Sequence, residues 1–321
     1  MPKQVAVAWS GGADSTMLLL LLKDLGFDVQ AWHIDHGWHA QSFQLTTVLS
    51  KQAAQWAIDF HVKHLEKPKQ NIESEARQGR YAAFADLAKE QSCYHVALGH
   101  HADDQAETVC MRLLQGAGVA GCQGIRMHRE QSGLHFWRPL LDVSRHSIEA
   151  ELKARGIPWT KDPSNEDESL WRNKIRHSLF PKMASHAINP QQLFLRWQKQ
   201  ACEVQQKIVD LAQGIMIKKY KDGESIFCEM DWLMWCEQIS PVRVYLLQNM
   251  VGLLFNDGTV FGRRHILAIE QWREHGGNGW LNLSGCCLYR QGQGLQLCQG
   301  KTSLRDNKKN KCKTRLEVKD E

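Results

Sequence analysis

The stretch VAVAWSGGADS, residues 5–15, decides the fold of this chain. Its first four residues are apolar, which is typical of a short buried strand. Two adjacent glycines break the strand, and the residues from Asp14 onward can begin a helix that continues to Leu25. A strand that leads through a glycine turn into a helix is the opening of a βαβ unit. The stretch therefore predicts an α/β protein.

The following residues continue this alternation. Short apolar segments predict strands at 29–34, 60–62 and 95–98, and longer segments predict helices at 41–57, 72–89 and 103–114. Alternation at this spacing predicts a doubly wound parallel sheet. Because ligands of such sheets bind at the carboxyl ends of the strands, the polar strand exits are expected to meet in one crevice. These exits are residues 10–15, 35–36 and 99–104.

Changes in residue composition along the sequence divide the chain into four parts. We expect an α/β domain at 1–185, a helical connector at 186–220, a smaller α+β domain at 221–300 and a basic tail at 301–321. The third part alternates tryptophan- and phenylalanine-rich segments with glycines. The tail concentrates lysine and arginine, so we expect it to be disordered, with a nucleic-acid arm as the alternative.

Composition excludes several classes of protein. The chain has 321 residues, of which 43% are hydrophobic and 23% charged, as in ordinary folded proteins and unlike disordered ones. Ten cysteines show neither CxxC pairs nor zinc-site spacing, so reduced thiols are expected. No apolar run is long enough to span a membrane and no secretory leader pattern is present, so we expect a cytoplasmic protein. A net charge of +5 is weak evidence for a nucleic-acid partner.

The glycine turn has the chemistry of an anion site. Gly11 and Gly12 let the backbone approach a ligand closely, and the amides that follow, from Ala13, lie at a helix N-terminus. Ser10 and Ser15 add hydroxyl donors. No Walker lysine follows, so a pyrophosphate held by backbone and hydroxyl donors is favoured over a Walker ATPase. A tight turn with a serine cap is the structural alternative.

A second polar segment combines carboxylates on one helix. Glu107 lies four residues after Asp103 and three after Asp104, so one helix face presents carboxylates. Such a face suits Mg²⁺ together with substrate phosphates, or an ammonium group. Capping of the helix N-terminus is the alternative.

Several segments of the chain resemble the motifs of a known family. Residues 10–15 resemble the signature of the PP-loop ATP pyrophosphatase superfamily. Segments 107–118, 138–141, 159–165 and 172–176 resemble one of its branches, the tRNA(Ile)-lysidine synthetases. The resemblance covers Val5 to Pro181, and residues 231–297 resemble the family's small middle, tRNA-binding domain more weakly.

The resemblance implies an ATP-dependent carbon–nitrogen ligase that modifies tRNA. ATP adenylates the O2 oxygen of the wobble cytidine in the CAU anticodon of isoleucine tRNA. The ε-amine of free L-lysine then attacks carbon 2 of the base, which gives lysidine and releases AMP, pyrophosphate having left earlier. The product reads AUA instead of AUG, and its identity changes from methionine to isoleucine.

The resemblance also implies roles for single residues. The 10–15 loop would hold the pyrophosphate, while Asp14 would orient the loop or, with Asp104, bind Mg²⁺. Four carboxylates would bind the ammonium groups of lysine or accept the proton of its ε-amine: Asp35, Asp103, Asp104 and Glu107. The resemblance does not divide these two roles among them.

Basic and aromatic residues are the candidates for RNA contact. Arg172, Asn173 and Arg176 share one helix face and form a candidate clamp on the phosphate backbone, with pairing to acidic residues at 162–167 as the alternative. Arg112 is a further candidate, with a plain exposed helix arginine as its alternative. A flipped cytosine needs an aromatic or apolar pocket, for which Trp171, Trp159 or Phe136 is available unless they belong to the core.

Other interpretations stay open. A small-molecule amide synthetase of the same superfamily would release pyrophosphate without RNA, and a non-catalytic nucleotide- or RNA-binding module would release none. A homodimer also stays open. Gln115 stands where many family members have a basic residue. Longer members carry a further C-terminal domain, and here either the basic tail replaces it or the enzyme binds tRNA through fewer contacts.

Overall fold

A computed structural model describes residues 3–35, 42–65, 72–160, 171–222, 225–255, 261–283, 285–299 and 315–317. The chain divides into two compact units, Met1–Cys202 and Glu203–Glu321. The division falls inside helix α9 (Pro190–Leu211), within the segment for which a connector is expected. Each unit is described by itself.

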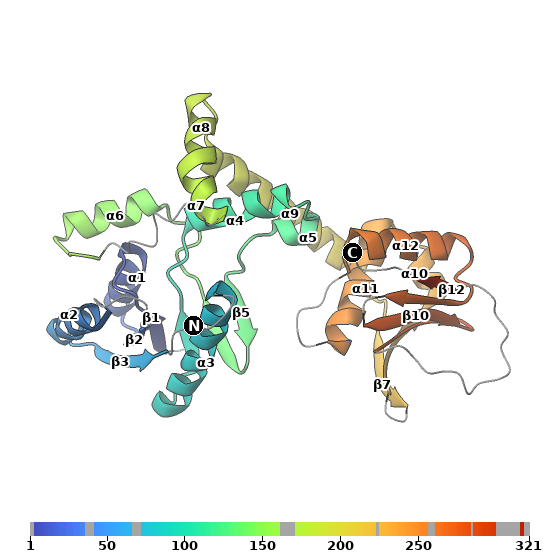
Figure 1. Ribbon diagram of the computed structural model, residues 1–321, viewed down its shortest axis with the longest axis horizontal. Helices are drawn as coiled ribbons and strands as arrows, with labels where there is room; N and C mark the ends of the chain where they lie inside the picture. The colour runs from blue at the N-terminus through green and yellow to red at the C-terminus, as the bar shows by residue number, and fades with distance from the viewer. Residues whose placement is uncertain are drawn as a thin grey trace. The chain divides into compact units, whose positions relative to one another are not determined.

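The first unit is built on a six-stranded sheet (Figure 1), which confirms the α/β fold. The strands follow the order β3 (Asp59–His64), β2 (Asp28–Asp35), β1 (Gln4–Ala8), β4 (His95–Ala97), β6 (Leu134–Trp137) and β5 (His128–Gln131). All neighbours are parallel except β5 and β6. The sheet is therefore mixed, with one antiparallel edge strand.

The hairpin of β5 and β6 is not predicted from the sequence. Its two-residue turn, Ser132-Gly133, has φ of 53° and 76°, the left-handed conformation that tight hairpins favour. Three of the four residues of β5 are exposed, and all four are polar. A strand at a solvated edge needs no apolar run, so hydrophobicity gives no signal for it.

Side chains alternate between the two faces of this sheet. Val5 and Val7 pack into one cluster with helices α1 (Ala13–Asp24), α2 (Ser42–Gln55) and α6 (Arg145–Ala154). Ala6 belongs to a second cluster with α3 (Ile72–Gln91) on the opposite face. Helices thus cover both faces, which keeps the polar chemistry at the strand ends.

The strand order changes direction between β1 and β4. From β1 the chain builds β2 and β3 on one side and then returns to place β4 on the other. Helices α1 and α4 (Ala102–Leu114) begin just after these two neighbouring strands. Their starts lie at the topological switch point, the usual ligand crevice of open α/β sheets.

Short helices continue the first unit after α6. They are α7 (Trp171–Lys174), the π-helical turn η2 (Ile175–Leu179), α8 (Phe180–Ser185) and the first half of α9. Ile175 and Phe180 pack with Ala106 and Cys110 of α4. This apolar contact holds the helical segment against the helix that carries the predicted acidic face.

The second unit is an α+β fold with its own sheet. The strand order is β12 (Arg315–Glu317), β9 (Trp280–Leu283), β10 (Cys286–Gln291), β11 (Gly294–Gln299), β8 (Ser225–Asp231) and β7 (Lys218–Asp222). Apart from the parallel pair of β12 and β9, neighbours are antiparallel. One face packs on helices α10 (Trp232–Cys236), α11 (Ser240–Leu254) and α12 (Arg263–Glu274).

Two boundaries differ from the sequence-based expectation. Helix α9 ends at Leu211 and the second sheet begins at Lys218, slightly before the expected 221. Three residues of the tail, Arg315–Glu317, form β12, so the expectation of a structureless tail does not hold for them. The rest of 301–321 lies outside the described residues. Among the described helices, none combines the length and the apolar character that crossing a bilayer would require.

The core of the second unit depends on Trp235, which is fully buried and donates from Nε1 to the carbonyl of Arg243. Trp235→Ala should lower the free energy of unfolding of this unit by about 3–5 kcal/mol, because it leaves a large cavity. Leu233→Ala, on the same helix but 55% exposed, should change it by less than about 0.5 kcal/mol. Urea unfolding with hydrogen exchange of β8–β11 measures both, and equal losses would contradict the assignment of the core.

Candidate functional site

The loop between β1 and α1 is held in shape by its own serines. The Ser15 hydroxyl accepts from the Ser10 amide at 3.2 Å and donates to the Gly12 carbonyl at 3.2 Å. Gly11 has a φ of +82°, a conformation that favours glycine. Its carbonyl accepts from the amide of Thr160 at 2.8 Å, so a distant segment also anchors the loop. Helix α1 then begins at Ala13, and its first amides lack partners within the helix.

The turn after β4 lies directly against this loop. A Cβ atom on Gly99 would lie 3.0 Å from the Ser15 nitrogen and 3.1 Å from the Asp14 carbonyl carbon. Backbone atoms cannot move aside as a flexible side chain can, so a glycine is needed at this position. The close approach brings the start of α4 next to the start of α1.

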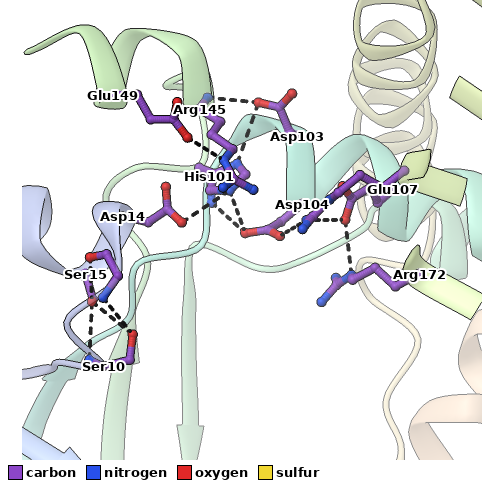
Figure 2. A network of polar contacts seen from close by, with 12 residues as sticks. Ser10, Asp14, Ser15, His101, Asp103, Asp104, Glu107, Arg145, Glu149 and Arg172 are labelled. Carbon is purple, nitrogen blue, oxygen red and sulfur yellow. Dashed lines mark hydrogen bonds and ion pairs between the residues drawn. The ribbon is translucent and has the colours of Figure 1, made fainter. Parts of the chain in front are cut away.

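His101 lies at the centre of the group of carboxylates that results (Figure 2). Its ring is 3.7 Å from Asp14 Oδ2, 3.6 Å from Asp103 Oδ2 and 3.5 Å from Asp104 Oδ2. The side chain of His101 is only 3% exposed. No role for this histidine was predicted from the sequence. Its position on a strand exit beside two aspartates was the available signal.

The same cluster shifts the pKa values of its members. Burial raises the pKa of Asp14, with a further rise from Asp104, while His101 and Arg145 oppose the shift. Burial opposes the charged form of His101, but the three carboxylates around it raise its pKa. The contact with His101 lowers the pKa of Asp103 to about 2, and the Arg145 amide contributes. Asp103 and Asp14 lie on either side of the His101 imidazole, and their pKa values therefore shift in opposite directions.

Asp103 joins three elements of the first unit. Its Oδ2 accepts from the backbone amide of Arg145 at the start of α6 at 2.9 Å, and its Oδ1 accepts from Gln191 Nε2 of α9 at 3.4 Å. Figure 2 shows Asp103 turned toward Arg145. The geometry thus gives Asp103 partners within the protein, while the Oδ1 atom of Asp14 is buried without a hydrogen-bond partner.

Glu107 is an internal ion-pair partner. It is 2% exposed, and both of its oxygens accept from Arg176, at 2.6 and 3.0 Å. Arg172 adds a contact of 3.3 Å to the same carboxylate and donates to Thr108 Oγ1. Burial raises the pKa of Glu107 and the arginines oppose that shift, so its charge depends on them. A bidentate arginine pair in this geometry holds η2 on α4.

The other predicted residues are distributed as follows. Arg112 donates to the Gly121 carbonyl at 2.7 Å and so holds α5 (Val119–Cys122) on α4. Asn173 is 5% exposed, which argues against direct contact with RNA, and the face of α7 that it shares with the two arginines is turned toward α4. The alternative partners at 162–167 lie outside the described residues.

Asp35 lies at the end of β2. Its Oδ2 is 3.0 Å from Nδ1 of His64 on the neighbouring strand β3. The structure therefore brings Asp14, Asp103 and Asp104 together around His101, joins Glu107 to them through Arg176, and gives Asp35 a separate histidine partner. No alternation pattern could have indicated the His64 contact, because it depends on the register of β2 and β3.

A cation and a phosphate both fit this arrangement. The orphaned Asp14 Oδ1 beside Asp104 offers carboxylate oxygens next to the loop amides. Among the described residues, no group of three or more His, Cys, Asp or Glu side chains has the geometry of a complete metal cage. Mg²⁺ is usually held by one or two carboxylates together with substrate phosphates, and Asp14 and Asp104 offer two.

A parallel sheet with a glycine loop and a helix start at its switch point defines the class of α/β proteins that bind phosphate groups. The chain belongs to the PP-loop family, because the family model described as "PP-loop domain" matches residues 1–183, more than half of its 321 residues.

Proteins called tRNA(Ile)-lysidine synthase are similar to this region. That of Geobacter sulfurreducens is 40% identical over 197 residues, which cover 58% of this chain and 41% of the relative. That of Chlamydia pneumoniae is 37% identical over 182 residues, 56% of this chain and 57% of the relative. That of Polaromonas naphthalenivorans is 35% identical over 212 residues, 65% of each. The chain thus spans about half the length of the curated relatives it matches.

A solved structure shares the fold. The U34-tRNA thiolase NcsA from Methanococcus maripaludis aligns with a TM-score of 0.51 over 62% of this chain and 72% of its own. At 16% sequence identity, this likeness concerns the fold alone.

Gly99→Ala should displace the 10–15 loop, because the new Cβ meets backbone at 3.0–3.2 Å. Overpacking of this kind costs about 1–3 kcal/mol, so the affinity for ATP, the expected ligand, should fall about 5- to 150-fold. Gly118→Ala is the matched control, since a Cβ there meets nothing within 4 Å and its φ of −76° suits alanine. Calorimetric titration measures both, and unchanged affinity in Gly99→Ala would contradict the close approach.

Arg176→Ala should lower the free energy of unfolding by about 3 kcal/mol, because it leaves Glu107 buried with only the weaker Arg172 contact. The raised pKa of Glu107 then rises further, so the deficit should shrink as the pH falls from 7 to 5 and the carboxyl is protonated. Urea unfolding with hydrogen exchange of α4 measures this.

Two controls test the origin of that loss. The double variant Glu107→Gln/Arg176→Met removes both charges and should recover part of the stability. Arg155→Ala, which breaks only surface pairs with Asp24 and Glu151, should have little effect. A pH-independent loss in Arg176→Ala would mean that packing, and not the unpaired charge, is responsible.

Proposed function

We propose that this chain ligates free L-lysine to carbon 2 of the wobble cytidine in the CAU anticodon of isoleucine tRNA. The observation that carries the proposal is the meeting of the 10–15 loop with Asp14, His101 and Asp104 at the switch point of the sheet. The lysidine synthases among the relatives support the choice of substrates, because their similarity covers this region.

The loop suits the first half-reaction. Ser10, Gly11, Gly12, Ala13 and Ser15 would hold the β- and γ-phosphates of ATP as the α-phosphate is transferred to the O2 oxygen of cytosine and pyrophosphate leaves. The amides at the start of α1, which lack partners within the helix, would donate to these phosphates and stabilise the charge that develops. Asp14 and Asp104 would hold Mg²⁺, which supplies charge neutralisation for the phosphates.

The acidic cluster suits the second half-reaction. The lysine ε-amine attacks carbon 2, and its proton goes to a carboxylate. The bond between carbon 2 and O2 then breaks, and AMP leaves with the O2 oxygen and both electrons of that bond. Glu107 is 2% exposed and paired with two arginines, so it is the least available to an amine, whereas the side chains of Asp103 and Asp104 are 23% and 14% exposed. Holding the amine and the adenylated base together supplies the entropic part of catalysis.

Isotopic lysine tests the whole proposal. The chain is incubated with ATP, Mg²⁺, labelled lysine and unmodified isoleucine tRNA that carries CAU. ATP-dependent labelling of the RNA is expected. The same tRNA with uridine at the wobble position should take up no label, since it lacks the cytosine. Pyrophosphate release with a different acceptor would indicate another adenylating enzyme, and none under any condition would indicate a binding module.

Asp14→Ala should reduce lysine transfer by at least about 100-fold, the usual cost of losing a group that acts on charge in the transition state. Its raised pKa means that ionised Asp14 costs folding free energy at neutral pH. The variant should therefore be no less stable than the wild type. Asp24→Asn, at the exposed end of the same helix, is the control and should retain activity. Normal turnover of Asp14→Ala would remove the loop from the mechanism.

A further inference from the structure

The segment from Trp171 to Cys202 has an unusual charge pattern. It contains six lysines or arginines and no aspartate or glutamate. It also carries two exposed tryptophans, Trp171 at 63% and Trp197 at 49%. Basic residues interleaved with exposed aromatic rings are typical of surfaces that bind single-stranded nucleic acid.

The start of this segment packs against the helix that carries the candidate site. Arg172 and Arg176 contact Glu107, and Ile175, 1% exposed, packs on Ala106 and Cys110. These contacts place α7 and η2 beside the helix that carries Asp104. The face turned to α4 is the one for which an RNA clamp is predicted from the sequence.

The opposite side of α7 and η2 is open to solvent. Trp171 and Lys174 are exposed and lie three residues apart, and His177 is exposed in the next turn. Three residues on a helix bring two side chains onto one face. An indole ring and an ammonium group therefore lie next to each other on a helix whose inner side is fixed.

We propose that Trp171 and Lys174 form an RNA-contact surface, on which an unpaired base stacks on the indole while the ammonium group meets a phosphate. This inference rests on the proposed function, because the RNA it concerns is the anticodon loop. Every base has a π-face, so stacking on tryptophan needs no particular sequence, and loop bases can be splayed out at small cost.

Charge complementarity selects RNA as the occupant. A single exposed tryptophan on a protein surface is ordinary. Here it stands at the beginning of a stretch without aspartate or glutamate, next to the acidic site that the substrate must reach. Two of the six cations in this stretch, Arg172 and Arg176, pair with Glu107, and the other four are Lys174, Lys182, Arg196 and Lys199. A polyanion is favoured along such a stretch, whereas an apolar protein partner would leave Lys174 desolvated without a counter-charge.

The other two aromatic candidates are unavailable for stacking. Phe136 is fully buried in the cluster beneath α3, and Trp159 is half-buried against the cluster beneath α1. Among these three rings, only Trp171 offers a face to a nucleotide.

The test uses the full chain and a fluorescently labelled anticodon stem–loop RNA with CAU. Trp171→Ala should weaken binding roughly 5- to 150-fold, the range for loss of one base stack, while Trp171→Phe retains most of the affinity. Trp197→Ala, at a site 49% exposed on α9 in the same basic segment, should stay within twofold, because the proposed stack is on Trp171. Lys174→Ala should lower the slope of the logarithm of the affinity against the logarithm of salt concentration by about one.

Three results would overturn the proposal: binding of Trp171→Ala within twofold of the wild type, equal losses in Trp171→Ala and Trp197→Ala, or no rescue by phenylalanine. Thermal melts establish that each variant is folded, which is expected because the ring is exposed. Lysine incorporation by the wild type separates this inference from the proposed function. Stacking-dependent RNA binding without lysine transfer would refute the function alone, whereas lysine transfer with unchanged kcat/KM for tRNA in Trp171→Ala would refute the stacking surface alone.

Discussion

The site depends on the contact between two pieces of backbone, Gly99 after β4 and Asp14–Ser15 at the start of α1. With atoms at 3.0–3.2 Å from the position of a Cβ, only glycine lets the two helix starts approach. That approach places His101 among the carboxylates of Asp14, Asp103 and Asp104. The unfavourable burial of Asp14, and the orphaned oxygen that comes with it, follow from the same approach. Such a cost is common where a protein keeps a site ready for a ligand.

A second constraint fixes the other side of the crevice. Glu107 is buried and needs Arg176 and Arg172 to stay charged, so α4 and the α7–η2 segment are linked electrostatically as well as through their apolar cluster. The π-helical geometry of η2 begins at Ile175, beside this link. π-helical turns are rare in proteins, and those that occur are frequently at functional sites. The position of η2 beside the candidate site agrees with this tendency. Trp171 directly precedes Arg172, so the same link positions the part of the helix from which its ring projects.

Much of the first unit could be predicted because its signals are local. The apolar runs of β1, β2 and β4 and the glycine loop after β1 identify parallel strands that meet helices at one edge, and the structure confirms this α/β fold. The hairpin of β5 and β6 escaped prediction, since an edge strand of polar residues shows no hydrophobic pattern. The RNA clamp predicted for Arg172, Asn173 and Arg176 rests on helical spacing and stays a prediction. Spacing shows which residues share a face, but not whether that face meets solvent or another helix.

The sequence by itself therefore determined the alternation of strands and helices from β1 to α4, the glycine loop after β1, and the residue types available for the chemistry. These properties follow from periodicity, backbone conformation and side-chain chemistry, all of which act over a few residues. The tertiary structure alone decided which carboxylates share His101, that Glu107 belongs to two arginines, that Asp35 faces His64, and which tryptophan stays open to solvent. Those outcomes depend on strand register and helix packing, which join residues far apart in the chain. Neither leaves a local mark in the sequence.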